Sequence, residues 1–307
     1  MLRTKSSSQV IVQFIFLFIF TVIASIVFAQ IPKDVKNNLK VPDSEHLQVI
    51  TTHDKSTMIG RIVEIKEQEI LFKTDFGEIT IPIQKIKSIE LVPTSAIKEG
   101  KYWFPNPNAT RLFVGNSARM LKKGDGYFAD SYLFFPSIAY GITDNFTIGG
   151  GMSLIPGLGI DKQFFYFTPR VGLKASQNLN FAAGALIIKI PDFNDDDDDG
   201  TPLVGLLNVV GTYGSTNSSI TFGLGYGFVD DDIADKPFIL IGGEHRISRR
   251  LSLVTENYLL PGVDDPLISY GIRFFGEKIS VDLAFLNTLS DEIIFPGIPY
   301  VDFVFNF

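Results

Sequence analysis

From about residue 110 to residue 307, apolar side chains alternate with small or polar ones in successive segments of about ten residues. In one such segment Ile220, Phe222 and Leu224 alternate with Thr221 and Gly223. Successive side chains of a strand point to opposite faces, so each segment has one apolar face and one small or polar face. After the N-terminal segment, no apolar run is long enough for a membrane-spanning helix. The pattern predicts strands of the length that crosses a bilayer at a tilt.

Twelve strands are expected in this region, at about 110–119, 127–141, 146–155, 163–174, 179–190, 202–213, 219–229, 237–247, 251–260, 267–275, 279–287 and 298–307. Their second face is mostly Gly, Ala, Ser and Thr, whereas the wet face of a soluble sandwich is usually rich in Lys and Glu. We therefore expect an all-β fold, a roughly 12-stranded antiparallel transmembrane barrel, with apolar side chains facing lipid.

A few charged residues interrupt the small face of these strands. A charge facing lipid near the bilayer midplane costs about 2–4 kcal/mol, which assigns these side chains to the barrel interior. The expected lumen-lining residues are Arg170, Lys174, Lys189, Glu244, Arg246, Glu256, Arg273, Asp282 and Asp302. They either line a water-filled pore or form a salt-bridged interior that blocks passage, and the sequence leaves both open.

The joints between predicted strands differ in length at the two ends. Joints after even-numbered strands are tight, as at 177–178, whereas most joints after odd-numbered strands are long and acidic, as at 191–201. Outer-membrane barrels have short periplasmic turns and longer external loops, so a periplasmic N-terminus fits. Only the first joint, 122–126, is short where this rule expects length.

The N-terminus has the features of an export signal. Arg3 and Lys5 precede an apolar run from residue 10 to Ala29, and we expect a signal peptide at 1–29 that is cleaved after Ala29. An uncleaved membrane anchor is the alternative, and both readings export the chain. Cysteine is absent, which excludes disulfides, thiolate metal sites and a lipidated cysteine. The net charge of −7 argues against binding nucleic acid.

Between the signal and the barrel we expect a linker at 30–44, a small β-domain at 45–92, a second linker at 93–109 and the barrel at 110–307. The small domain contains five short β-branched segments, at 47–52, 58–65, 69–74, 78–81 and 86–91. Strands so short bury a core only by curling into a barrel-like sheet. The stretches 57–63 and 76–82 resemble SH3-like or Sm-like small barrels.

The last segment, 299–307, is an amphipathic strand that ends in an aromatic residue. It resembles the C-terminal signal of bacterial outer-membrane proteins, matched here by Val301, Phe303, Phe305 and Phe307. The hairpins at 140–146 and 213–217 are similar to those of such barrels in Bacteroidota-type bacteria. The resemblance implies recognition by the barrel-assembly machinery, contact with outer-membrane lipid, and a periplasmic small domain.

Motifs for catalysis or cofactor binding are missing from the sequence. The histidines His46, His53 and His245 show no metal-ligand spacing, and no nucleophile elbow occurs, so we expect neither an enzyme nor a cofactor. Asp195, Asp197 and Asp199 form a weak candidate metal site, because alternating carboxylates before a glycine can hold calcium. The alternative is a solvated acidic loop, which could also bind divalent cations that bridge to lipopolysaccharide.

Three functions remain open at this level. The preferred hypothesis is a narrow pore or small-solute transporter in the outer membrane. The second is a non-conducting barrel that anchors the small domain or displays its loops to partners. The third is a secreted soluble β-protein.

Overall fold

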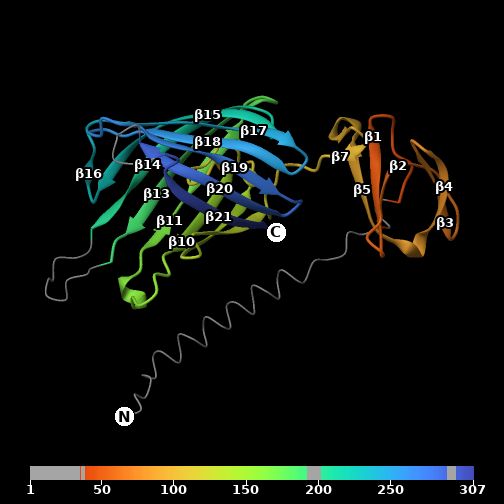
Figure 1. Cartoon of the computed structure of the whole chain (residues 1–307), viewed down its shortest axis with the longest axis horizontal. Coiled ribbons are helices and arrows are strands. Elements are labelled where there is room, and N and C mark those ends of the chain that lie inside the picture. Colours follow the sequence, from red (N-terminus) through yellow and green to blue (C-terminus); the bar gives the residue numbers. More distant parts are fainter. Residues whose placement is uncertain (1–34, 36–38, 192–201, 289–294) are drawn as a thin grey trace, which may run out of the picture. The chain divides into compact units, whose positions relative to one another are not determined.

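The computed structural model describes residues 35, 39–191, 202–288 and 295–307, and the candidate metal site at Asp195, Asp197 and Asp199 lies outside them. The chain forms two compact units that divide between Trp103 and Phe104 (Figure 1). Among the described residues, no helix is long and apolar enough to span a bilayer.

The first unit contains a five-stranded antiparallel sheet, as expected. Its strands, in the spatial order β4-β3-β2-β1-β5, are β1 (His46–Thr52), β2 (Thr57–Ile65), β3 (Glu69–Thr74), β4 (Gly77–Pro82) and β5 (Ile86–Pro93). A 3-10 turn, η1 (Ile83–Lys85), joins β4 to β5. Alternate positions supply the core, in which Ile50, Ile62 and Phe72 are fully buried. Gly60 is required where β2 crosses β3, because a Cβ there would lie 2.1 Å from the carbonyl oxygen of Lys73.

The stretch expected as a linker, 93–109, divides between the two units. It begins with a second 3-10 turn, η2 (Thr94–Ala96), and a short hairpin of β6 (Ile97–Lys98) and β7 (Lys101–Tyr102). Glu99 and Gly100 form the hairpin turn with positive φ, at 53° and 70°. From Phe104 onward the chain belongs to the second unit.

The second unit is a closed antiparallel barrel of twelve strand positions, one of them shared by β11 and β12. The strands are β8 (Gly126–Ser131), β9 (Phe135–Thr143), β10 (Phe146–Met152), β11 (Phe165–Phe167), β12 (Arg170–Lys174), β13 (Leu179–Lys189), β14 (Leu203–Gly214), β15 (Ser218–Val229), β17 (Phe238–Ser248), β18 (Leu251–Leu259), β19 (Leu267–Phe275), β20 (Ile279–Thr288) and β21 (Ile298–Asn306). Pairing of β21 with β8 closes the sheet. A short strand, β16 (Asp232–Ile233), extends the hairpin beyond β15, and a 3-10 turn, η3 (Ile160–Lys162), lies between β10 and β11.

Two of the predicted strands were wrong, although the count of twelve was right. The segment 110–119 forms no strand, and its apolar side chains Leu112, Phe113 and Ala118 are buried inside the barrel. The predicted strand 127–141 is the hairpin of β8 and β9. Its turn contains Tyr132 and Leu133 with φ of 56° and 64°, a conformation that usually calls for Gly or Asn.

The two faces of the barrel wall differ as the alternation predicts. On β15 the outward side chains of Ile220 and Phe222 are 59% and 55% exposed, whereas the inward Thr221 is fully buried. The hydroxyl oxygen of Thr221 lies 2.8 Å from that of Thr212, an inward residue of β14, at hydrogen-bond distance. The outward surface is therefore a broad apolar belt.

The two ends of the barrel also differ. At one end, called here the turn end, the joints are short, as at 144–145, 249–250 and 276–278. At the other, the loop end, the joints are mostly longer, as at 153–164 and 260–266. The short first joint expected at 122–126 is not a hairpin between strands, and the actual first hairpin turns at 132–134.

Candidate functional site

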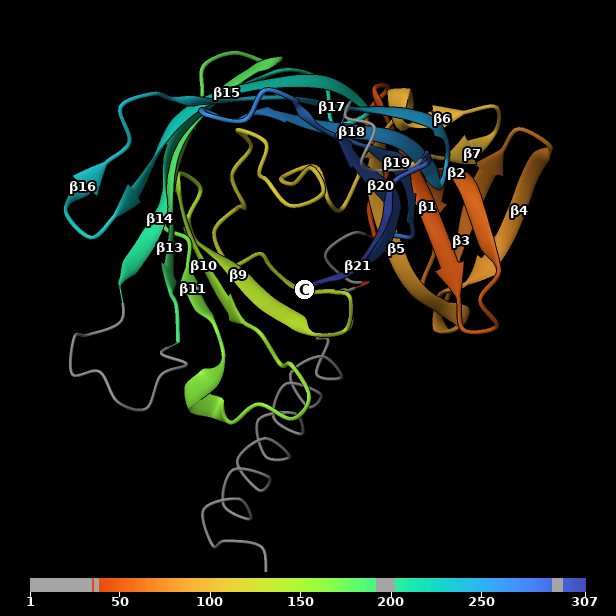
Figure 2. The ribbon, with the colours of Figure 1, turned by 60° about the vertical axis from the view of Figure 1, so that its left-hand side comes forward.

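Residues 104–125, called here the inserted segment, run through the inside of the barrel before β8 begins (Figure 2). The segment has almost no regular structure, only an isolated bridge between Arg111 and Asn116. Its backbone therefore needs hydrogen-bond partners from the wall. The inward-facing charges of the barrel supply many of them, and this network is the candidate functional site.

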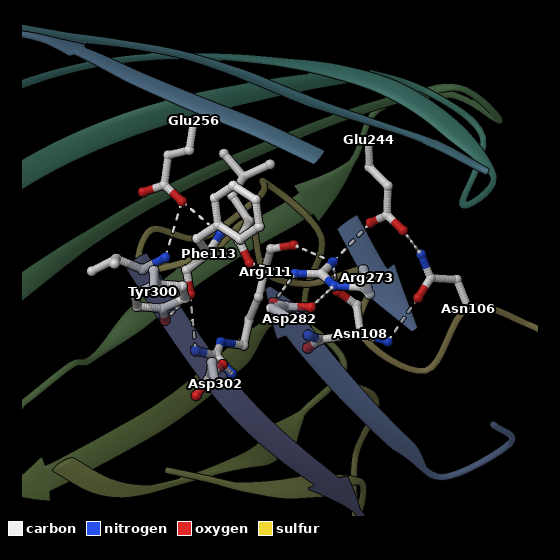
Figure 3. A network of polar contacts seen from close by, with 12 residues as sticks. Asn106, Asn108, Arg111, Phe113, Glu244, Glu256, Arg273, Asp282, Tyr300 and Asp302 are labelled. Carbon is white, nitrogen blue, oxygen red and sulfur yellow. Dashed lines mark hydrogen bonds and ion pairs between the residues drawn. The ribbon is translucent and has the colours of Figure 1, made fainter. Parts of the chain in front are cut away.

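Arg273 on β19 is the centre of the network (Figure 3). Its side chain is fully buried and lies beside Asp282 of β20, with Nε and Nη2 donating to the two carboxylate oxygens at 2.7 and 2.8 Å. Nη1 also donates to Glu244 of β17 at 2.8 Å. Planar bidentate pairing of this kind suits guanidinium and is stronger than a neutral hydrogen bond.

Arg273 also holds the backbone of the inserted segment. Its Nη1 donates to the carbonyl oxygens of Asn108 and Arg111, at 3.3 and 3.2 Å, and its Nη2 donates to that of Leu112 at 2.6 Å. The side chain of Arg273 thus binds two buried carboxylates of the wall and three buried carbonyl oxygens of the inserted segment. This arrangement compensates charges that would otherwise be costly to bury.

A second ion pair joins the inserted segment to β21. Arg111 lies 3.0 Å from the carboxylate of Asp302, and both side chains are buried. Asp302 also accepts a hydrogen bond from Ser131 at 3.0 Å. Tyr300, two residues before Asp302, donates to the carbonyl oxygen of Phe113 at 3.1 Å and packs against its ring.

Glu256 of β18 binds the tip of the inserted segment. Its carboxylate accepts the backbone N–H groups of Phe113, Val114 and Gly115, at 2.6, 3.0 and 2.8 Å. The hydroxyl of Tyr258 donates to the same carboxylate at 2.5 Å. Gly115 allows this approach, because a Cβ there would lie 2.7 Å from the Tyr258 hydroxyl oxygen.

The rest of the inserted segment is fixed near the turn end of the barrel. Asn106 donates to Glu244 at 2.7 Å, and Arg246 donates to the carbonyl oxygen of Phe104 at 2.8 Å. Arg170 donates to the carbonyl oxygen of Ser117. Arg119 donates to the carbonyl oxygens of the last residue of β14 and of the residue after it. The anchoring contacts thus come from many strands around the barrel.

Seven of the nine charged residues expected in the lumen are buried inward-facing side chains, namely Arg170, Glu244, Arg246, Glu256, Arg273, Asp282 and Asp302. Lys174 is exposed at the turn end of β12. Lys189 corrects the expectation: it pairs with Phe165 and Leu203, which are 42% and 43% exposed on the outward face. Lys189 is the last residue of β13, so its ammonium group can extend past the end of the strand into water.

The residues of the expected assembly signal lie on β21 and just after it. Val301, Phe303 and Phe305 alternate with the buried Tyr300, Asp302 and Val304, so they face outward. Phe307 follows β21, and its backbone exchanges two hydrogen bonds with Gly126 at 2.9 and 3.0 Å. It therefore lies at the seam where the barrel closes.

Sequence reasoning missed every contributor from the inserted segment, above all Asn106, Asn108 and Arg111. Two signals were available. The stretch 104–119 contains three Asn and lacks strict alternation of apolar and polar residues. A strand at 110–119 also required a short first joint at 122–126, where the rule on joint lengths expects a long one. The reason that they did not suffice is physical. Leu112, Phe113 and Val114 are as apolar as a lipid-facing strand, and only the fold shows that they point into the barrel.

The histidines lie apart from this network. His245 is exposed on the outward face of β17, and its Nδ1 lies 3.0 Å from the hydroxyl of Ser218 on β15. His46, in the small unit, lies 2.7 Å from a carboxylate oxygen of Asp43. Within the described residues no three His, Cys, Asp or Glu side chains cluster as metal ligands would.

No protein-family model and no curated protein matches the chain. Several solved structures do. OmpF of Salmonella typhi in complex with daunomycin is 12% identical, over 86% of this chain and 95% of that one, with a TM-score of 0.33. The trimeric outer-membrane protein OmpT of Vibrio cholerae is 11% identical, over 86% and 97%, with a TM-score of 0.32. The toluene transporter TbuX of Ralstonia pickettii is 10% identical, over 86% and 89%, with a TM-score of 0.32. At these values the similarity supports no functional assignment.

Proposed function

We propose that the chain is an outer-membrane β-barrel that transports small solutes and is closed at rest by its own inserted segment. The observation that carries the proposal is the occupation of the turn-end half of the barrel by residues 104–125, held by buried ion pairs centred on Arg273. The inserted segment is held by separate side-chain contacts, whereas the wall is a continuous ladder of backbone hydrogen bonds between neighbouring strands. The inserted segment is therefore the part that moves.

The apolar belt supports a membrane location. Outward side chains such as Phe222, Val171 and Leu283 are 55%, 57% and 45% exposed, and monomeric soluble proteins rarely expose contiguous apolar surfaces of this extent. This argues against a secreted soluble protein. The short joints support a periplasmic turn end, because outer-membrane barrels have short periplasmic turns, and we assign the small N-terminal domain to the same compartment.

The last strand, the small domain and the hairpin sequences support further parts of this proposal. The outward alternation of Val301, Phe303 and Phe305, followed by Phe307 at the seam, fits a strand that the barrel-assembly machinery recognises. The small domain, with its strand order β4-β3-β2-β1-β5 and 3-10 turn before β5, fits an SH3-like or Sm-like module. We assign the source of the chain to Bacteroidota-type bacteria on its hairpin sequences.

The acidic loops are a proposed contact with the cell surface. Asp230, Asp231 and Asp232 at the loop end are exposed, as are Asp264 and its neighbours in the loop after β18. Exposed carboxylates at this level attract divalent cations that bridge to the anionic lipopolysaccharide. In the sequence, Asp195, Asp197 and Asp199 fall in the joint between β13 and β14, and we propose the same use for their carboxylates.

A second candidate is a non-conducting barrel that anchors the small domain. The pairing of Arg273 with two carboxylates, and of Arg111 with Asp302, favours it, because a permanently filled interior needs every buried charge compensated. The two candidates differ in whether the inserted segment leaves the lumen.

Conductance in planar bilayers separates them. The wild-type barrel is expected to show rare steps, and Glu256→Gln, which weakens the hold on the tip, frequent discrete steps. Thr255→Val changes the neighbouring outward side chain and serves as the matched control, expected to behave as wild type. If the Glu256→Gln barrel never conducts, although heat-modifiable gel mobility shows that it is folded, the non-conducting anchor is the correct function instead.

A further inference from the structure

The loop-end half of the barrel has an inner surface unlike the charged turn-end half. The strand pairing places Leu186, Ile188, Val204, Leu206, Leu267 and Leu286 on the inward face there. Leu186 pairs with Leu206 and Ile188 with Val204, so apolar side chains adjoin across β13 and β14. The inward face of β18 carries one charged side chain at this level, Glu256, whose carboxylate already accepts three backbone N–H groups and the hydroxyl of Tyr258.

This inner surface borders open space. The six apolar side chains are only half-buried, although the wall encloses them. Val114, at the tip of the inserted segment, is 64% exposed even though Glu256 holds its backbone inside the barrel. Gly227 faces inward opposite Leu206, and a Cβ there would meet nothing closer than 3.9 Å. We call this space the apolar chamber, with Val114 as its floor.

The chemistry of the chamber limits what it can hold. The closed wall surrounds it laterally and the inserted segment lies beneath it, so its occupant is a small molecule. Placing an ion against aliphatic side chains without partners would cost far more than the contacts return. The nearby hydroxyls of Tyr258 and Tyr300 already donate to Glu256 and to the carbonyl of Phe113. Tyr166, opposite Ile188, and Asn208, two residues from Leu206, add uncharged polar groups to this face. The main favourable interaction is removal of apolar surface from water, worth about 25 cal/mol per Å².

We propose that the apolar chamber binds an uncharged, largely apolar small molecule, which rests on Val114. This inference rests on the proposed transport function and names the class of its substrate. Contact with Val114 places the bound molecule against the tip of the segment that closes the barrel, so binding and opening involve the same residue.

The test is saturable binding of naphthalene to the full-length protein in lipid nanodiscs, with empty nanodiscs to subtract partition into lipid. Naphthalene-2-sulfonate is the charged analogue. A saturable component for naphthalene and none for the sulfonate is expected. No saturable naphthalene component, or equal binding of the sulfonate, would overturn the inference.

Three variants locate the binding. Leu206→Gln makes the chamber wall polar, and Gly227→Leu fills the space without meeting the backbone; each is expected to weaken naphthalene binding about tenfold or more. Leu207→Gln is the matched control, because Leu207 is the next residue and faces outward with 44% exposure. Equal binding by Leu206→Gln and Leu207→Gln would place the ligand elsewhere and refute the chamber. Conductance of the Glu256→Gln barrel is independent of naphthalene, so a conducting barrel without naphthalene binding overturns this inference alone.

Discussion

Arg273 and Asp282 lie directly opposite each other on β19 and β20, and two hydrogen bonds of 2.7 and 2.8 Å join guanidinium to carboxylate with both side chains fully buried. The same guanidinium holds three carbonyls of the inserted segment. The ion pair is therefore also the attachment of a segment that is distant in sequence. One side chain therefore contributes both to the wall and to the attachment of the inserted segment.

Replacing Arg273 with methionine tests that dependence. Arg273→Met leaves Asp282 and Glu244 buried without their cation, which typically costs about 3–5 kcal/mol. We expect a lower urea midpoint for unfolding in lipid, measured by heat-modifiable gel mobility. The double variant Arg273→Met with Asp282→Leu is expected to recover part of the loss, because a pair replaced by apolar groups leaves less unpaired charge. If the double variant is as unstable as Arg273→Met, the unpaired carboxylate of Asp282 is not the main cause of the lost stability.

Glu256→Gln should loosen the tip of the inserted segment while leaving the wall intact. A neutral amide oxygen accepts backbone N–H groups less strongly than a carboxylate, by about 1–2 kcal/mol in total. Hydrogen exchange of the Phe113, Val114 and Gly115 amides is therefore expected to accelerate about tenfold. Thr255→Val is the control on the outward face. Unchanged exchange at all three amides would mean that Glu256 does not hold the tip.

The sequence was sufficient for most of the wall, from β10 onward, because the wall follows a local rule. Alternation identified which face of β15 and β20 is apolar, and the cost of a charge in lipid placed Arg273 and Asp282 inside. The same rule was misapplied to Lys189, which the strand register places on the outward face beside Phe165 and Leu203. A charge near a strand end can reach water from either face, so the lipid cost no longer decides its direction.

The interior could not be predicted in the same way. The contacts of Glu256 with Phe113, and of Arg111 with Asp302, join positions separated by 143 and about 190 residues. No periodicity encodes such pairs. The inserted segment takes its conformation from the wall, so its residues carry the composition of a strand without forming one.

The small unit offers a prediction on pH. The Thr52 hydroxyl and the Ser56 backbone N–H, which lies 3.1 Å away, donate to the exposed carboxylate of Asp54 and lower its pKa. A carboxyl whose pKa is lower in the folded state stabilises the fold at pH above its unfolded pKa, about 3.9, and this contribution is lost as pH falls through the folded value. Asp54→Asn should therefore lose less stability than wild type between pH 6 and pH 2.

Thermal unfolding of the small unit within the full chain, followed by NMR at pH 6 and pH 2, measures this difference. Asp75→Asn removes another exposed carboxylate, from the turn between β3 and β4, and is the matched control. The same loss of stability on acidification in wild type and Asp54→Asn would contradict the role of the Thr52–Asp54 hydrogen bond.

Phe307 should matter more for assembly in the cell than for the stability of the finished barrel. Its backbone pairs with Gly126, and this pairing survives Phe307→Ala, while the ring is 38% exposed and contributes only part of its burial energy. The expected result is a strong reduction in outer-membrane protein, with a urea midpoint close to wild type after refolding in lipid. Phe274→Ala removes an outward aromatic ring of 44% exposure from β19 and is expected to leave the cellular level unchanged. If the two alanine variants reach the membrane equally well, Phe307 is part of the seam and not of an assembly signal.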